Sequence, residues 1–453
     1  MQTRILAEFI EQTGYEQIPA KAIETARLAF LDCLGVALAG SLDEAPRKVV
    51  EFVRDLGGKP EATIIGTSIK SSSPLAALAN GTASHVLDYD DTIKSLIGHP
   101  SVVLVSTVLA VSERCKSSGK EALAAYILGL EIGGRLGSLC GPDHFNLGWH
   151  NTSTLGSIAA AVAAGKLLKL DKGSMAAAIG IAAAESSGLR KNFGTMTKSF
   201  QAGHAAMNGV IAGLLASNGF TAGEDILEGD LGLCNLLSGG KEYDYSALVS
   251  GLGSSWNTIS PGITFKPYPS CRGTHPAIDA ALYLKNEYGI SSGDIAHVDC
   301  IVSRFEAGIL QYHEPRTGLE GKFSLEYCVA VALHEGEVAM KHFTPQVVLS
   351  DEIQKLTHKV TCVYPPEIPN ELRQPMEVVV KLQNGKTFSK KVEVADTKGD
   401  PSNPMANEEL VAKYRECAAL VLPPEKVETT LGLITGLDSL KDLSSLTGLL
   451  SPG

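Results

Sequence analysis

Apolar residues recur every three or four positions along most of the first 260 residues, which is the spacing of one face of an amphipathic helix. The segment that Pro19 opens shows this spacing at Ile23, Ala26 and Phe30, and Gly40 closes it, as helix starts and stops are expected to do. The same pattern predicts further helices over residues 73–88, 121–136, 152–168, 174–187 and 201–217.

Alanine and glycine are unusually frequent on these predicted helices, as in IAAAVAAGK (residues 158–166) and AGHAAMNGVIAG (residues 202–213). Glycine inside a helix is unfavourable on its own, so it needs close packing or a function to justify it. Small residues let neighbouring helix backbones approach closely. The pattern therefore predicts central helices that are covered on most sides.

The pattern changes after about residue 265. Residues 297–305 and 358–364 have the composition of strands, and residues 324–334 read as a helix. Residues 376–382 and 387–394 flank Asn384 and Gly385, which predict a hairpin with a type I′ turn. Residues 396–404 read as a linker, and helices are predicted over 407–420 and 424–434, followed by a loose end from residue 441.

These patterns predict a mainly α protein with a large all-helical domain and a smaller α+β lid domain. The helical domain is expected to comprise residues 1–264 and 396–453, because a lone helical pair at the C-terminus has little core of its own. The lid domain is expected to comprise residues 265–395.

Bulk composition narrows the class of protein. A net charge of −11 without a Lys/Arg-rich stripe argues against a nucleic-acid partner. The N-terminal segment is a charged amphipathic helix without the apolar region of a signal peptide, and the apolar run 34–39 is too short to span a bilayer. Nine cysteines without a CxxC pair fit reduced thiols. We therefore expect a soluble cytoplasmic protein with no membrane partner.

Four polar segments interrupt the helical pattern: LDYDDTIKSLIGHPS (residues 87–101), GWHNTSTLG (148–156), NFGTMTKSFQAGH (192–204) and FKPYPSCRGTH (265–275). Carboxylates, imidazoles and ammonium groups are costly to bury, so they rarely gather between apolar helices by accident. If the helices converge, these groups meet in one pocket that is suited to moving protons on a small anion.

The first segment carries three closely spaced carboxylates, Asp88, Asp90 and Asp91. They could bind Mg²⁺, they could accept hydrogen bonds that orient neighbouring histidines and a lysine, or they could cap a helix on the surface. Because His85 and His99 lie beside them, we favour membership of a site.

The second and third segments each offer one candidate for proton transfer. His150 precedes the start of a predicted helix, whose partial positive charge lowers an imidazole pKa and suits a neutral base; the alternative is a histidine packed beside Trp149. A lysine between apolar helices pairs with a carboxylate or has its pKa lowered, so Lys198 is a candidate proton carrier or carboxylate ligand. The alternative for Lys198 is an exposed, solubilising side chain.

The fourth segment is a proline-stiffened connector at the predicted domain junction, where clefts form. It carries Lys266, Cys271, Arg272 and His275 as candidate substrate-binding residues, unless it is an exposed linker with solvated charges. Cys271 and His275 could form a nucleophile pair, but without an Asn or Asp partner at a recognisable spacing we expect Cys271 to line the pocket.

Several common signatures do not occur in the sequence: GxGxxG, GxxxxGK[ST], GxSxG and HExxH. The sequence therefore gives no positive case for a redox cofactor, a Schiff-base cofactor or a metal, and we expect none.

The motifs LDYDDT followed by GHPS, GWHNTSTLG, KNFGTMTK and GKFSLEY (residues 321–327) resemble, in order, those of the MmgE/PrpD family. That family includes 2-methylcitrate dehydratases, cis-aconitate decarboxylases and iminodisuccinate epimerases. The resemblance implies an all-helical domain joined to an α+β lid with the active site between them, a homodimer, and no metal or organic cofactor. By motif matching it also implies active-site positions at Asp88, Thr92, His99, His150, Lys198, Lys266 and Tyr327.

Two positions differ from branches of that family. The decarboxylase branch has a histidine at the position of Cys271, and the dehydratase branches carry a different segment there. The epimerase branch has a tyrosine at the position of Phe145. Since Phe145 removes the second base that an epimerase would use, we favour a lyase.

The leading hypothesis is a cofactor-independent lyase that dehydrates or decarboxylates a small di- or tricarboxylate. Lys198, Lys266 and Arg272 would hold the carboxylates and the developing negative charge, and His150 or Lys198 would move the proton. Asp88 would orient His99 as the general acid of a dehydratase, and Thr92 would add a hydrogen bond. The alternatives are an epimerase of the iminodisuccinate type, a non-catalytic carboxylate-binding protein, and a metal-dependent hydrolase that uses the three carboxylates.

Overall fold

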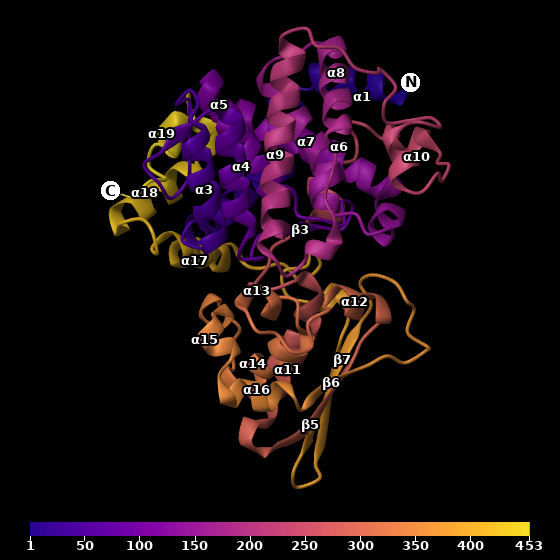
Figure 1. Cartoon of the computed structure of the whole chain (residues 1–453), viewed down its shortest axis with the longest axis vertical. Coiled ribbons are helices and arrows are strands. Elements are labelled where there is room, and N and C mark those ends of the chain that lie inside the picture. The colour runs from indigo at the N-terminus through magenta and orange to yellow at the C-terminus, as the bar shows by residue number, and fades with distance from the viewer. Residues whose placement is uncertain (453) are drawn as a thin grey trace.

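The computed structural model describes residues 1–452, and the chain is mainly α, as the sequence pattern predicts. The centre of the helical part is formed by long, apolar helices: α2 (Ala20–Gly40), α4 (Ser73–His85), α5 (Pro100–Cys115), α6 (Gly119–Asn146), α7 (Asn151–Leu167) and α9 (Met196–Ser217). Helix α9 packs against both α4 and α7, and α7 packs against α6 (Figure 1). Their faces form one large hydrophobic core.

Shorter elements surround this centre: α1 (Gln2–Gln12), α3 (Glu44–Leu56), α8 (Lys172–Ala184), α10 (Leu233–Leu237), and the two-residue strands β1 (Ala62–Thr63) and β2 (Lys70–Ser71). Helix α6 has the length and apolar composition of a membrane-crossing helix, but 89% of its most apolar stretch is buried inside the fold. Core helices of globular proteins meet the same criterion.

Small residues set the distance between central helices, as expected from the sequence. A Cβ atom added to Gly81 on α4 would lie 2.6 Å from the Cα atom of Gly203 on α9. The two backbones therefore touch at this crossing, and no larger residue fits at Gly81 without a shift of one helix.

A second hydrophobic core lies in the C-terminal half and is built on a four-stranded sheet of order β6-β5-β7-β8. Its strands are β5 (Ile295–Ile301), β6 (Val360–Val363), β7 (Met376–Leu382) and β8 (Thr387–Val392); β5 runs parallel to β6 and antiparallel to β7. Helices α11 (His275–Tyr288) and α14 (Leu325–Glu335) pack together, and α11 contacts β7 and β8. The remaining helices are α12 (Arg304–Ile309), α13 (Gly318–Gly321), α15 (Pro345–Val348) and α16 (Asp351–Thr357).

After the sheet the chain returns to the helical part through α17 (Asn407–Ala418), α18 (Pro424–Thr435) and α19 (Ser444–Thr447). Helices α17 and α18 both pack against α2. The prediction of a loose end from residue 441 is wrong, because Leu443, Leu446 and Leu450 are fully buried. Their side chains complete the core, and the Gly66 N–H donates to the Leu450 carbonyl at 2.8 Å.

Two predictions for the sheet region are also wrong in detail. The strand expected over 297–305 ends at Ile301, because the Ser303 hydroxyl accepts from the Glu306 N–H and starts α12. In the hairpin, Gly385 has a φ of 85° whereas Asn384 is not in the left-handed region. A type I′ turn needs positive φ at both central residues, so the structure has a longer turn with glycine in the left-handed position.

Candidate active site

A short pairing brings the first and last polar segments together. Strand β3 (Thr92–Ile93) pairs antiparallel with β4 (Ile263–Thr264), with Thr92 opposite Thr264. The acidic loop before β3 therefore lies beside the connector that follows β4. This places Asp88 next to Lys266, which is 178 positions away in the chain.

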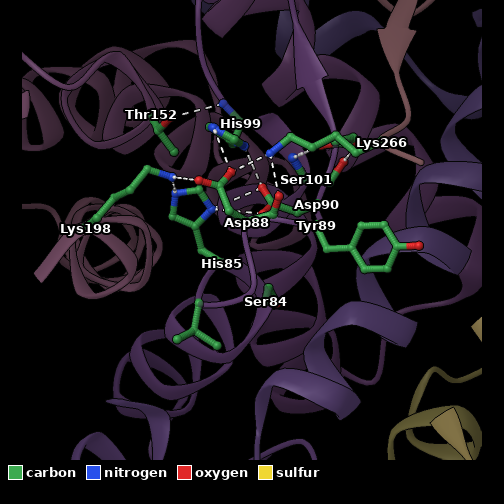
Figure 2. Close-up of polar contacts among 12 residues, drawn as sticks. Ser84, His85, Asp88, Tyr89, Asp90, His99, Ser101, Thr152, Lys198 and Lys266 are labelled. Carbon is green, nitrogen blue, oxygen red and sulfur yellow. Dashed lines mark hydrogen bonds and ion pairs between the residues drawn. The ribbon is translucent and has the colours of Figure 1, made fainter. Parts of the chain in front are cut away.

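Asp88 lies between two lysines at the centre of the polar cluster (Figure 2). The Lys266 ammonium donates to the Asp88 carbonyl at 2.7 Å and also to its carboxylate, and Lys198 Nζ donates to Oδ2 at 3.1 Å. Burial alone raises the pKa of Asp88, but Lys198 and Lys266 outweigh it and lower the pKa well below its usual range. Asp88 has a φ of 50°, a left-handed conformation that an aspartate tolerates better than most residues.

A second carboxylate, Asp90, connects two imidazoles. His85 Nδ1 lies 3.1 Å from both carboxylate oxygens of Asp90, and His99 Nδ1 lies 2.7 Å from Oδ2 (Figure 2). Lys198 Nζ donates to His85 Nε2 at 2.8 Å, so the proton of neutral His85 is on Nδ1 and is donated to Asp90. Burial raises the pKa of Asp90, but the two histidines lower it well below its usual range.

His99 is held neutral. Burial lowers its pKa to about 3 although Asp90 opposes the shift. With Nδ1–H donated to Asp90, Nε2 carries the lone pair and lies 4.0 Å from an Asp88 oxygen. The sequence hypothesis made His99 a general acid, but in the free protein its imidazole can only accept a proton at Nε2.

His150 has the protonation pattern of a base. It precedes α7, as expected, and its pKa is lowered well below the usual value, first by burial and then by the charge of Lys198. Its Nδ1 lies 2.7 Å from Gln201 Oε1, and the Gln201 amide donates to the Leu189 carbonyl, which fixes the amide orientation. His150 Nδ1 is therefore the donor. Within residues 1–452, Nε2 of this buried imidazole has no hydrogen-bond partner.

A cavity of about 100 Å³ opens beside these imidazoles. His99, His150 and Thr92 line one side, and the Thr92 hydroxyl has no hydrogen-bond partner among the described residues. Apolar side chains form much of the wall, among them Phe145, Phe193 and Ile309. Residues of the C-terminal half complete it: Cys271, Arg272, Glu306 and Arg373. The cavity thus combines neutral bases, cations and a largely apolar surface.

Eight of the residues singled out from the sequence gather in the polar cluster or on the cavity wall: Asp88, Thr92, His99, His150, Lys198, Lys266, Cys271 and Arg272. Two do not line the cavity. The fully buried Tyr327 donates its hydroxyl to the His342 carbonyl inside the second core, which corrects the expectation of a substrate contact. His275 is also buried, with Nε2 3.2 Å from the Ser270 carbonyl and its ring against Tyr268.

The three carboxylates of the acidic segment do not converge on one point. Asp91 faces away from Asp88 and Asp90 and bonds the backbone N–H and hydroxyl of Ser101. Burial raises the pKa of Asp91 to about 8. The hypothesis of a magnesium site on these three carboxylates therefore does not fit the geometry. Among the described residues, the side chains close enough together to bind one metal ion are His85, Asp90 and His99. Both histidines already hydrogen-bond Asp90.

Sequence reasoning missed three charged residues at the site, Lys322, Glu306 and Arg373, of which the first two are buried. Lys322 lies in the GKFSLEY segment, donates to the Val86 carbonyl at 3.1 Å and lines a small pocket with Asp88 and Lys198. Burial lowers its pKa to about 8. The motif itself could have pointed to Lys322, whereas nothing in the local sequence singles out Glu306 or Arg373.

The fold and the site define a mainly helical protein that has a second, sheet-based core and a small cavity lined by neutral bases and cations. The chain belongs to the MmgE/PrpD family. The MmgE/PrpD N-terminal domain matches residues 4–246, and the MmgE/PrpD C-terminal domain matches residues 268–438.

Curated relatives cover nearly the whole chain. A cis-aconitate decarboxylase of Aspergillus terreus is 30% identical, over 99% of this chain and 96% of its own length. The cis-aconitate decarboxylase of Mus musculus is 28% identical, over 94% of this chain and 89% of its own. A mitochondrial 2-methylcitrate dehydratase of Yarrowia lipolytica is 26% identical, over 82% and 73%.

Proposed function

We propose that the chain is a lyase that acts on a small tricarboxylate by moving a proton at a carbon next to a carboxylate, with groups of its own chain. The observation that carries this proposal is the unpartnered Nε2 of His150, a buried and neutral imidazole that faces a cavity with arginines on its wall. A base must reach the proton it moves, and its pKa must keep it unprotonated at working pH.

The charges around the cavity suit the intermediate. Loss of a proton or of CO₂ next to a carboxylate leaves negative charge on carbon, delocalised onto carboxylate oxygens. Lys198 and Lys266 place two ammonium groups against a single carboxylate, Asp88. The two ammonium groups balance the charges of Asp88 and Asp90 and keep cationic groups inside the buried site, where they would stabilise a developing anion strongly.

The relatives indicate which lyase reactions to test first. The relatives that cover 94–99% of the chain are cis-aconitate decarboxylases, and a 2-methylcitrate dehydratase covers 82%. The neutral state of His99 favours decarboxylation, because hydroxide needs an acid to depart whereas CO₂ does not. The carbanion that CO₂ leaves behind would take its proton from the Lys198 ammonium, which would be recharged from solvent. An epimerase needs one group that removes the proton and a second that returns it on the opposite face of the carbon, and Phe145 can serve as neither.

The α+β part would act as a lid over the site. Arg272, Glu306 and Arg373 come from this part and line the same cavity as His99 and His150. Closure would bring the two arginines onto the substrate and expel water. Crystals grown with and without a tricarboxylate analogue should differ in the angle between the two parts; equal angles would contradict the lid.

A homodimer is part of the proposal, and light scattering should give twice the chain mass of 47.7 kDa.

Proton NMR in deuterated water tests the proposed reaction directly. Purified protein would be incubated with cis-aconitate, citrate, 2-methylcitrate and iminodisuccinate in turn. We expect either loss of CO₂ from one tricarboxylate with uptake of one deuterium at the carbon that is protonated, or loss of water without net uptake of deuterium into the product. A metal chelator in a parallel sample tests the hydrolase alternative. Substrate binding without turnover or deuterium exchange in any sample would contradict the lyase and leave a carboxylate-binding protein.

A further inference from the structure

Two arginines line the cavity wall in addition to the imidazoles that the proposed proton transfer uses. Arg272 follows the connector before α11, and Arg373 lies in the loop between β6 and β7, yet both line the cavity that His99 and His150 face. A guanidinium carries five N–H donors in a planar fork that matches a carboxylate. The two arginine side chains therefore place many N–H hydrogen-bond donors on one wall of the cavity.

Within residues 1–452 these donors are almost unused. The Arg272 guanidinium has one ion pair, to Asp400 at 3.7 Å, which is too long for a direct hydrogen bond. The Arg373 guanidinium makes no hydrogen bond or ion pair; only its backbone N–H is bonded, to Glu306 Oε1 at 2.5 Å. Burial, then the positive charge of Arg272, lowers the pKa of Arg373 to about 10, so both side chains stay cationic at neutral pH.

Glu306 holds the two arginine segments in place. It lies at the start of α12, accepts the Arg373 N–H, and packs so closely on the other segment that a Cβ atom at Gly273 would lie 3.0 Å from its Oε2. The Ser303 hydroxyl, which starts α12, also donates to the Glu371 carbonyl in the Arg373 loop. Among the residues that line the cavity here, one carboxylate therefore lies beside two guanidinium groups, and Asp400 lies outside the wall.

Arg373 lies at a boundary between the cavity and a larger groove, as do Ile97 and Phe145. Arg373 and Leu372 also line a larger groove of about 710 Å³, whose wall includes Lys94 and Ser260. The cavity and the groove therefore share a boundary at Arg373, whereas the Asp88–Lys198 cluster is not part of that groove.

We propose that Arg272 and Arg373 form a subsite for a carboxylate of the substrate that does not react, and that this subsite makes the cavity selective for tricarboxylates over dicarboxylates. The inference rests on the proposed function for the class of substrate. It assigns a specificity role to Arg373, a residue outside the recognised motifs. Occupation of the subsite pairs both guanidinium groups and holds the reacting carbon near His150.

Calorimetry with two unreactive probes tests the subsite. Tricarballylate has three carboxylates but no hydroxyl group and no double bond, and methylsuccinate has the same skeleton with one terminal carboxylate replaced by hydrogen. We expect the unmodified protein to bind tricarballylate at least tenfold more tightly. Arg373→Gln and Arg272→Gln should each weaken tricarballylate binding about tenfold or more, and change methylsuccinate binding less than threefold.

Two further variants keep the test decisive. Arg304→Gln removes an exposed arginine from α12 and should keep the selectivity of the unmodified protein. Arg373→Lys keeps the charge without the planar fork, and it should lose part of the selectivity even if the glutamine variant fails to fold. Equal binding of both probes by the unmodified protein, or full selectivity in Arg373→Lys and Arg272→Gln, would overturn the subsite.

The binding measurement does not depend on turnover. If the subsite is present but no tricarboxylate reacts in deuterated water, the proposed reaction fails and the subsite stands. If turnover occurs but the glutamine variants keep their selectivity, the subsite fails and the proposed reaction stands.

Discussion

Single hydrogen bonds decide what each imidazole of the site can do. The Gln201 amide fixes the proton of His150 on Nδ1, and Asp90 does the same for His99, so both histidines present a lone pair at Nε2. A histidine in the other tautomer would present an N–H group and could not accept a proton at that atom. The amide and the carboxylate therefore determine the chemistry of the residues that face the cavity.

Replacement of Gln201 by leucine tests the tautomer of His150. Loss of the Oε1 acceptor frees the imidazole to rotate or to carry its proton on Nε2, and a lost hydrogen bond of about 1–3 kcal/mol corresponds to roughly 10- to 100-fold in kcat. We expect kcat to fall by this factor with little change in KM. Gln201→Glu restores an acceptor, so it should recover part of the rate and shift the pH profile upwards. An unchanged kcat in the leucine variant would contradict the assigned tautomer.

Removal of Lys198 tests the polar cluster. Lys198 donates to His85 and pairs with Asp88, so alanine at this position removes one of the two cations beside Asp88. We expect turnover to fall by about 10²- to 10⁴-fold, the usual contribution of a positioned proton-transfer group. Circular dichroism should show a folded protein, because Lys266 still pairs with Asp88. The exposed Lys191, seven residues earlier, is the matched control, and Lys191→Ala should keep full activity.

At the scale of elements, the long helices could be predicted because their periodic apolar faces are local features of the sequence. Local signals failed where one residue decides the structure: Ser303 starts α12 where a strand was expected, and Asn384 stays out of the left-handed region. The buried C-terminal leucines show the same limit, because a short segment gives no sign of the core that receives it.

The candidate site could be predicted in part for the same reason. Polar segments between apolar helices stand out along the chain, so the sequence pattern predicts the cluster around Asp88. Arg373 comes from a polar loop that looks like any surface loop, and only the fold brings it to the cavity. Tyr327 has a motif that suggests a site, yet its hydroxyl is used within the second core.

The crossing of α4 and α9 gives a prediction at this scale. Gly81→Ala would place a methyl group against the backbone of Gly203, and such overpacking costs about 1–3 kcal/mol of unfolding free energy. Gly432 on α18 has open space around it, so Gly432→Ala should instead stabilise the protein by about 0.5–1 kcal/mol. Urea denaturation of both variants checks the pair. A Gly81→Ala protein as stable as the parent would show that the helices can separate at no cost.

At the scale of the whole molecule, buried histidines couple stability to pH. Burial lowers the pKa of seven histidines: His85, His99 (to about 3), His144 (to about 4), His150, His204, His275 and His342. In the unfolded chain they take up protons near pH 6.5, but in the folded protein they do not. Their contribution to stability is therefore complete above about pH 6.5 and is lost as the pH falls towards the folded values. Asp91, with a pKa of about 8, opposes this trend.

Thermal unfolding between pH 7.5 and 5 measures this effect. Each such histidine contributes up to about 1.4 kcal/mol per pH unit below its unfolded pKa. We expect Tm to fall steadily below pH 6.5, and His144→Gln, which changes a histidine outside the cavity wall, to reduce the slope. His297→Gln removes a histidine whose side chain is 42% exposed and should leave the slope as it is. A Tm that stays constant or rises on acidification would contradict the buried neutral state.

The chain enters the sheet-based part after β4 and leaves it before α17. Lys413 on α17 contacts the segment by which the chain enters. Its ammonium donates to the carbonyls of Tyr89 and Lys266 and pairs with the buried Asp32. A body attached at two neighbouring points can swing about the line through them, but it cannot slide or twist freely. If the sheet-based part moves as the proposed lid, we therefore expect a rocking motion whose pivot lies near Lys413, beside the loop that carries Asp88.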